Sequence, residues 1–160
     1  MIKILFVCHG NICRSPMAEF AMKALVKRAG LEASFEIASA ATSPEEIGNP
    51  VYPPARRKLL EHGIDPAGKT ARQMTAADYA AYDYLIGMDS RNLYNMRLLS
   101  GSDPDRKICR LLDFTASPRD IADPWYTGDF EQTWLDITEG CQALLERLRP
   151  EKKLSCPGSL

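Results

Sequence analysis

The chain has 160 residues, a length that suits a single domain with one hydrophobic core. Its 45% hydrophobic and 26% charged residues are the balance of an ordinary globular protein. A formal net charge of −1 gives no general basic field for nucleic acid, and no apolar run approaches the roughly 18 residues that a membrane span needs. We therefore expect a protein that binds no nucleic acid and has no membrane-spanning segment.

The predicted elements alternate between strands and helices. Residues 2–7 are a short run of branched apolar residues, which predicts a buried strand, and Pro16 begins a helix that ends before Gly30. Further strands are expected at 34–40, 84–88 and 108–112, and further helices at 54–62, from 75, at 91–99 and at 130–148, with a long loop over 113–127.

This alternation indicates right-handed βαβ crossovers and a parallel sheet covered by helices on both faces. Such α/β folds bind ligands at the carboxyl ends of the strands, beside the point where the strand order reverses. The residues after the first strand are therefore the first place to look for a site. We expect one domain over 1–149, followed by a disordered tail over 150–160 in which Cys156 has no evident role.

The cysteines and the N-terminus indicate where the protein works. The apolar run at 2–7 is too short for a signal peptide, because polar residues follow it at once. An odd number of cysteines in a chain without a signal peptide argues against a disulfide framework. The spacing of cysteine and histidine is poor for zinc. We expect a cytoplasmic protein with no metal and no other cofactor.

Cys8 and Arg14 bracket five residues between the first strand and the following helix. A short loop in this position can direct its backbone N–H groups at one centre, and with the helix N-terminus these groups make an anion site. Gly10 and Asn11 tolerate the backbone angles that a tight loop requires. Arg14 carries a planar fork that matches two phosphate oxygens.

The same surroundings favour a negatively charged sulfur on Cys8, because helix N-termini and nearby cations stabilise thiolates. The hydroxyl of Ser15 can add a hydrogen bond to that sulfur. A thiolate at the floor of a phosphate site is suited to nucleophilic attack on phosphorus. A phosphate-binding turn with a merely structural cysteine is the alternative. Walker-type nucleotide binding is not supported, since the Gly-x4-Gly-Lys-Ser/Thr pattern is missing.

Asp123 lies in the long loop after the fourth predicted strand, and Pro124, Trp125 and Tyr126 follow it. On its own, Asp-Pro is a common turn signal. Because this loop leaves the carboxyl end of a parallel strand, it can reach the same crevice as Cys8, where a carboxyl group can protonate a leaving group. Trp125 and Tyr126 would form an aromatic wall for a phenyl ring.

These segments together resemble the low-molecular-weight protein tyrosine phosphatases. The most specific matches are 7–16 and 123–126, with further matches at 39–43, 47–50, 71–73 and 88–89, and the similarity covers residues 2–148. The resemblance implies a three-layer α/β fold with a four-stranded parallel sheet of flavodoxin-like order 2-1-3-4. It also implies an enzyme that hydrolyses phosphotyrosine and small aryl phosphates.

In the reaction that the resemblance implies, Cys8 attacks phosphorus to form a phosphocysteine while Asp123 protonates the leaving phenol. Asp123 then helps to deprotonate the water that hydrolyses the intermediate, and Ser15 stabilises the departing thiolate. Arg14 and the loop amides bind the phosphoryl oxygens throughout. The implied phosphate-binding loop consists of His9, Gly10, Asn11, Ile12, Cys13 and Ser15.

The resemblance assigns further roles around this loop. Ser39 is implied to hold the loop in shape together with Asn11. Cys13 is implied to form a reversible disulfide with Cys8 under peroxide, and the alternative for Cys13 is a small buried residue. Many eukaryotic relatives carry an aromatic residue where this chain has Thr42-Ser43-Pro44-Glu45-Glu46, so we expect Glu45 to contribute an acidic wall to the substrate cleft.

The implied partners are phosphotyrosine-containing proteins, and a tyrosine kinase that phosphorylates Tyr126 is a further candidate. We expect a monomer or a weak dimer.

Protein arginine phosphatase is a close alternative function, although those relatives have threonine where this chain has Ile12. A thiol-dependent arsenate reductase would need a downstream cysteine pair, and no cysteine lies between Cys13 and Cys109. A phosphocysteine carrier would not need Asp123. An inactive phosphate-binding module would not need all three of Cys8, Arg14 and Asp123.

Overall fold

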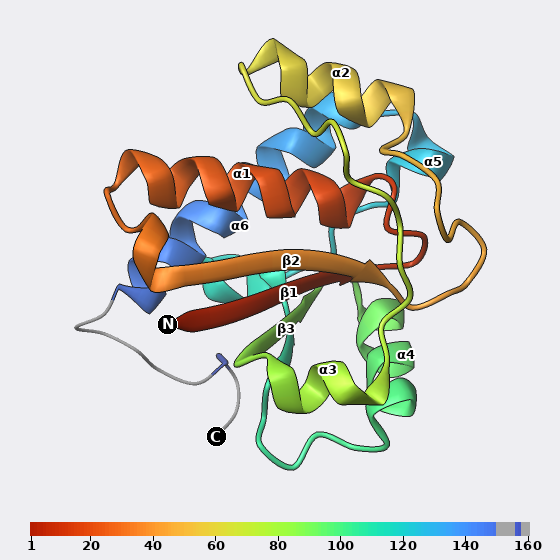
Figure 1. Ribbon diagram of the computed structural model, residues 1–160, viewed down its shortest axis with the longest axis vertical. Helices are drawn as coiled ribbons and strands as arrows, with labels where there is room; N and C mark the ends of the chain where they lie inside the picture. The colour runs from red at the N-terminus through yellow and green to blue at the C-terminus, as the bar shows by residue number, and fades with distance from the viewer. Residues whose placement is uncertain (150–155, 158–160) are drawn as a thin grey trace.

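The computed structural model describes residues 1–149 and 156–157, and a parallel sheet forms its middle layer (Figure 1). Four strands lie in the order β2-β1-β3-β4. They are β1 (Ile2–Cys8), β2 (Phe35–Ala41), β3 (Tyr84–Gly87) and β4 (Ile108–Arg110). The predicted fold class and strand order are confirmed.

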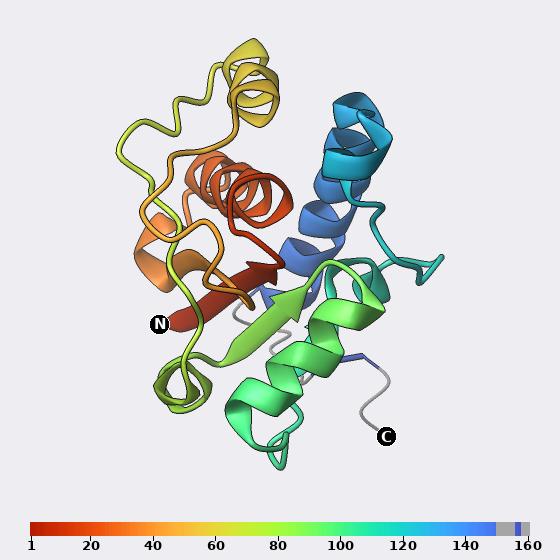
Figure 2. The same cartoon turned by 90° about the vertical axis from the view of Figure 1, so that its right-hand side faces the viewer.

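Helices cover both faces of the sheet, with α1, α2 and α6 on one side and α3 and α4 on the other (Figures 1 and 2). The order along the chain is α1 (Arg14–Arg28), the short 3₁₀ helix η1 (Glu32–Ser34), α2 (Pro53–Glu61), α3 (Ala76–Ala81), α4 (Ser90–Ser100), the 3₁₀ helix η2 (Leu111–Phe114), α5 (Pro124–Thr127) and α6 (Phe130–Leu148). In the described part of the chain, no helix is both long and apolar enough to cross a membrane.

The central strand β1 supplies both halves of the core, because successive side chains of a strand point to opposite faces. Ile4 and Phe6 join the cluster that packs against α1 and α6. Leu5 and Val7 join a second cluster, which includes side chains of α4. All four are fully buried, so β1 is anchored on both sides and its carboxyl end is a rigid platform.

Two predictions about the segment before α6 are wrong in detail. The fourth strand, expected to reach residue 112, ends at Arg110. The carboxylate of Asp113 accepts a hydrogen bond from the backbone N–H of Arg110 at 2.9 Å, which favours the tight turn of η2 over further strand. The expected loop over 113–127 also contains α5, which Asp123 caps and Pro124 begins.

The predicted disordered tail, 150–160, lies almost entirely outside the described residues. Cys156 is described, and it is buried, with 3% of its surface exposed. Its sulfur lies 2.7 Å from the sulfur of Cys109 in β4. For this residue the expectation of a disordered position is therefore wrong, because the thiol belongs to the same apolar core as α6.

Candidate active site

The predicted phosphate loop begins at the last residue of β1 and ends at the first residue of α1. Because β2 and β3 flank β1, the loop lies at the switch point of the sheet. The sulfur of Cys8 lies 3.0 Å from the Ser15 hydroxyl, and it accepts a hydrogen bond from the Ser15 backbone N–H at 3.4 Å. The nucleophile candidate and the first turn of α1 are therefore in direct contact.

Asn11 determines the shape of this loop. Its φ of 61° lies in the left-handed region, which costs energy for a residue with a side chain. Its amide nitrogen donates to the hydroxyls of Ser15 at 2.7 Å and Ser39 at 2.9 Å. Its amide oxygen accepts from the backbone N–H of Arg72 at 3.2 Å. The contact between Asn11 and Ser39 that the family resemblance implied is present.

The hydrogen-bonded chain continues beneath the loop to a buried carboxylate that sequence reasoning missed. The Ser39 hydroxyl donates to Glu19 at 2.5 Å, and Lys69 donates to the Ser39 carbonyl at 2.9 Å. Burial lowers the pKa of Lys69 below its usual range, against the opposing field of Glu19. Glu19 lies four residues after Ser15 on α1, so it projects from the same helix face.

Arg14 is 2% exposed and is fixed in one position. One terminal nitrogen donates to Asp89 and to the carbonyl of Ile121, both at 2.7 Å. Burial acts to lower the pKa of Arg14, but the charges of Cys8, Asp89 and Asp123 outweigh it and raise the pKa above its usual range. Sequence reasoning included Asp89 only in the matched segment 88–89 and gave it no role in the site, although it lies two residues after the end of β3, at the active edge of the sheet.

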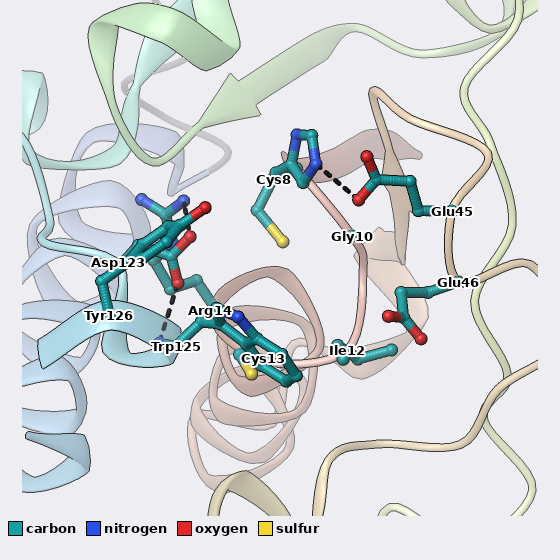
Figure 3. A pocket seen from close by; sticks show the side chains of 11 residues that line it. Cys8, Gly10, Ile12, Cys13, Arg14, Glu45, Glu46, Asp123, Trp125 and Tyr126 are labelled. Carbon is teal, nitrogen blue, oxygen red and sulfur yellow. Dashed lines mark hydrogen bonds and ion pairs between the residues drawn. The ribbon is translucent and has the colours of Figure 1, made fainter. Parts of the chain in front are cut away.

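Asp123 comes close to the phosphate loop although it lies more than 100 residues later in the sequence, just before α5. One carboxylate oxygen caps α5 by accepting from the Trp125 backbone N–H at 3.0 Å, and the other lies 3.4 Å from the second terminal nitrogen of Arg14. Figure 3 shows the sulfur of Cys8 directed into the space between Asp123 and Arg14 on one side and the Glu45–Glu46 segment on the other. The three predicted catalytic residues therefore meet in one pocket.

This pocket has a volume of about 130 Å³. Trp125 and Tyr126 form its aromatic wall, and the ring of Tyr52 packs against Trp125 with centroids 4.9 Å apart. Of the predicted site residues, Asn11, Ser15 and Ser39 lie behind the lining and support it. The lining residues are Cys8, His9, Gly10, Ile12, Cys13, Arg14, Glu45, Glu46, Asp123, Trp125 and Tyr126.

Glu45 and Glu46 lie on the wall of the pocket opposite the aromatic rings (Figure 3). His9 pairs with Glu45 at 3.0 Å between nitrogen and oxygen, and Glu46 accepts a hydrogen bond from Asn49 at 2.6 Å. Burial, and then the nearby charges of Cys8 and Asp123, raise the pKa of the Cys13 thiol, and Glu46 adds a smaller contribution in the same direction. Because the pKa is raised, Cys13 stays a neutral thiol at neutral pH.

A family model described as low molecular weight phosphotyrosine protein phosphatase matches residues 3–154. The chain belongs to this family. It is 40% identical over 156 residues to the low molecular weight protein-tyrosine-phosphatase YfkJ of Bacillus subtilis, covering 96% of this chain and 100% of that protein. The human low molecular weight phosphotyrosine protein phosphatase is 35% identical over 160 residues, and the match covers 90% of this chain and 94% of the human protein.

Solved structures of the family have the same fold. The crystal structure of the Bacillus subtilis YfkJ protein superposes with a TM-score of 0.92, covering 96% of this chain and 98% of that one. The crystal structure of the low molecular weight protein tyrosine phosphatase SP-PTP of Streptococcus pyogenes is 41% identical in sequence and superposes with a TM-score of 0.83. The match covers 94% of this chain and 95% of that one. The family resemblance read from the sequence motifs is confirmed.

Proposed function

We propose that this protein is a protein tyrosine phosphatase that hydrolyses phosphotyrosine and small aryl phosphates through a phosphocysteine intermediate. The observation that carries the proposal is the meeting of Cys8, Arg14 and Asp123 around one pocket. These residues come from the two ends of the domain sequence. A nucleophile, an anion clamp and a proton donor are the complete set that phosphoryl transfer to a thiol and then to water requires.

In the first step, the Cys8 thiolate attacks phosphorus and the bond between phosphorus and the phenolic oxygen breaks. Asp123 gives its proton to that oxygen, so the leaving group departs as a neutral phenol. Arg14 and the backbone N–H groups of residues 9–15 bind the phosphoryl oxygens, whose charge shifts during the transfer. Asp89 and the Ile121 carbonyl hold the Arg14 fork in place, which supports a fixed docking geometry.

In the second step, water attacks phosphorus and the sulfur–phosphorus bond breaks. Asp123, now a carboxylate, accepts a proton from the water, and inorganic phosphate is released. The departing thiolate of Cys8 is stabilised by the Ser15 hydroxyl, which lies 3.0 Å from the sulfur. The same hydrogen bond therefore assists the nucleophile in the first step and the leaving group in the second.

The choice of phosphotyrosine follows from the walls of the pocket. Trp125 and Tyr126 offer flat apolar surfaces to a phenyl ring, and Ile12 lines the pocket with an aliphatic side chain. A phosphoarginine substrate would place a cationic guanidinium beside Ile12, where no polar group of that side chain can meet it. The ratio of turnover of phosphotyrosine to phosphoarginine distinguishes these substrates, and a ratio below one would overturn the preference.

Cys13 is proposed as a protecting thiol for the nucleophile. Peroxide oxidises the Cys8 thiolate to a sulfenic acid with release of water, and Cys13 then attacks that sulfur and displaces a second water. The burial of Cys13 keeps it protonated until this step. Mass spectrometry after mild peroxide treatment tests the bridge, and Cys8 found as sulfinic acid with Cys13 still reduced would overturn it.

The proposed protein substrates and the cytoplasmic setting follow from the family. Tyr126 is 84% exposed, so a tyrosine kinase can reach its hydroxyl, and a phosphate there would crowd the mouth of the pocket. Incubation with a tyrosine kinase followed by peptide mapping tests this modification. An unphosphorylated Tyr126 beside other modified tyrosines would exclude it.

The central test is hydrolysis of para-nitrophenyl phosphate without added metal, with vanadate as inhibitor. Cys8→Ser should abolish turnover, whereas Cys141→Ala, which also removes a buried thiol but one far along α6, should keep it. Acid quenching with ³²P-labelled substrate should place the label on Cys8. Turnover by the Cys8→Ser protein, or a label on another residue, would overturn the proposed mechanism.

A further inference from the structure

A pair of thiols lies outside the candidate active site. Cys109 in β4 and Cys156 are 47 positions apart in sequence, and their sulfurs are 2.7 Å apart. A disulfide bond has a length of about 2.05 Å, so a shift of well under one ångström would bring the two atoms to bonding distance. Both residues are buried, and neither lines the active-site pocket.

The surroundings hold the two sulfurs against each other. Cys109 is paired with Ile86 on β3, so its side chain points into the core beneath α6. The Cys156 sulfur also donates to the carbonyl of Lys107 at 3.4 Å. Cys141 provides a contrast within the described residues, because its sulfur donates to the backbone carbonyl of Ala18 at 3.8 Å and has no thiol partner.

We propose that Cys109 and Cys156 form a reversible disulfide that fastens the end of the chain to the edge strand β4. The oxidant is a hydroperoxide. One thiol, as thiolate, attacks the peroxide oxygen and becomes a sulfenic acid, with release of water or an alcohol. The second thiol then attacks that sulfur, the S–S bond forms, and water leaves with the hydroxyl oxygen. Reduction by a dithiol reverses the reaction.

The reaction is expected to be slower than oxidation of Cys8. Burial raises the pKa of the Cys109 thiol, so little of it is present as the reactive thiolate. Oxidation of the pair therefore needs more peroxide or a longer exposure than oxidation of the active-site loop. Once formed, the bond closes a long loop and restricts the unfolded chain, which should raise the melting temperature by about 5–10 °C.

The test uses the full-length chain carrying Cys8→Ser and Cys13→Ser, so that a disulfide between the active-site thiols cannot contribute to the mass change. After treatment with hydrogen peroxide, the intact mass should fall by two hydrogens, and peptide mapping should recover a linked Cys109–Cys156 fragment. The melting temperature should rise, and dithiothreitol should reverse both changes. The wild-type chain should show the same linked peptide after longer exposure.

Two variants make the result specific. In this background, Cys156→Ser should abolish both the loss of two hydrogens and the rise in melting temperature. Cys141→Ala should still show both changes. The proposal is overturned when Cys109 and Cys156 remain alkylatable after an exposure far longer than the one that oxidises Cys8 in the wild type, when they are recovered as sulfinic acids, or when the link joins two chains. Because the readouts do not involve turnover, they are independent of the proposed phosphatase activity.

Discussion

The carboxylate of Asp89 binds Arg14 with one oxygen, at 2.7 Å, and caps α4 with the other, which accepts from the Asn92 backbone N–H at 2.8 Å. One side chain therefore ties the phosphate clamp to the helix that packs under β3. Arg14 is almost fully buried, and without an anion partner its desolvated charge would be costly. Asp89 thus determines where the guanidinium can lie before any phosphate arrives.

We expect Asp89→Ala to lower kcat/KM for para-nitrophenyl phosphate by about 10- to 100-fold, the equivalent of losing a charged hydrogen bond. Asp89→Asn keeps an oxygen acceptor for the α4 cap, so it should lose less thermal stability while still weakening the hold on Arg14. Steady-state kinetics and thermal melts of both variants separate the two roles. Unchanged kcat/KM in Asp89→Ala would show that Arg14 needs no positioning from Asp89.

The role of Asp123 predicts a dependence on the leaving group. Asp123→Asn should lower kcat for phosphotyrosine by about 10²–10⁴-fold, as expected for the loss of general acid catalysis. The loss should be smaller for para-nitrophenyl phosphate, because nitrophenolate departs with little help from a proton. Both substrates are assayed with the same enzyme samples. An equal loss for the two substrates would argue that Asp123 acts through the position of Arg14 and not through proton transfer.

The conformation of Asn11 allows strain to be separated from hydrogen bonding. Asn11→Gly adopts the left-handed φ of 61° without cost but loses the bonds to Ser15 and Ser39. Asn11→Ala loses the same bonds and is also strained, by about 1 kcal/mol. Both should lower kcat/KM, and alanine should lower thermal stability more than glycine. If both variants melt at the same temperature, the strain argument fails.

The acidic wall predicts a preference for basic peptides around the phosphotyrosine. Peptides with lysine beside the phosphotyrosine should have kcat/KM about 10-fold above peptides with glutamate there, at low ionic strength. The ratio should fall towards one in a Glu45→Gln, Glu46→Gln protein and in high salt. Glu36→Gln, at an exposed position near the start of β2, is the matched control and should keep the ratio. A salt-independent ratio near one in the wild type contradicts the prediction.

The Arg72–Asp78 pair predicts a pH dependence of stability. Burial acts to raise the pKa of Asp78, but hydrogen bonds from Arg72 and Thr75 outweigh it and lower the pKa. A folded-state pKa below the unfolded value of about 3.9 means that the pair stabilises the fold above that pH and that this contribution is lost as the pH falls through the folded value.

Asp78→Asn should therefore reduce the free energy of unfolding at pH 7 by about 1 kcal/mol, a modest value because Arg72 is 42% exposed and solvent screens the pair. The difference from the wild type should shrink as the pH approaches 3. Urea unfolding at several pH values measures it, with Asp105→Asn at an exposed position as the control. A difference that stays constant with pH would rule out the charge as its cause.

Some parts of this site could be predicted because they depend on neighbours in the chain. The segment from Cys8 to Arg14 has its own strand before it and its own helix after it, so its place at the N-terminus of a helix follows from local preferences. Asp123 was predictable through one general rule, that parallel strands deliver their following loops to the same edge of the sheet. The fourth strand was predicted two residues too long, because the hydrogen bond from the Arg110 backbone to Asp113 that ends it leaves no trace in the hydrophobic pattern.

The residues that escaped prediction act through contacts between distant segments. Glu19 and Lys69 meet beneath the loop only because α1 and the segment before α3 lie close together in the fold. Nothing in the sequence around either residue indicates that Glu19 is buried or that Lys69 is partly buried beside it. The same holds for Cys109 and Cys156, whose positions in a strand and near the chain end carry no sign that their sulfurs meet.

The order of residues along the chain by itself determined the alternation of strands and helices, the phosphate loop and its chemistry, because hydrophobic periodicity and loop composition act over short distances. The tertiary structure alone decided which charges surround Arg14, which groups support Asn11 and which thiols touch. Those contacts depend on how whole elements pack, and packing is a property of shape and burial that a linear pattern does not contain.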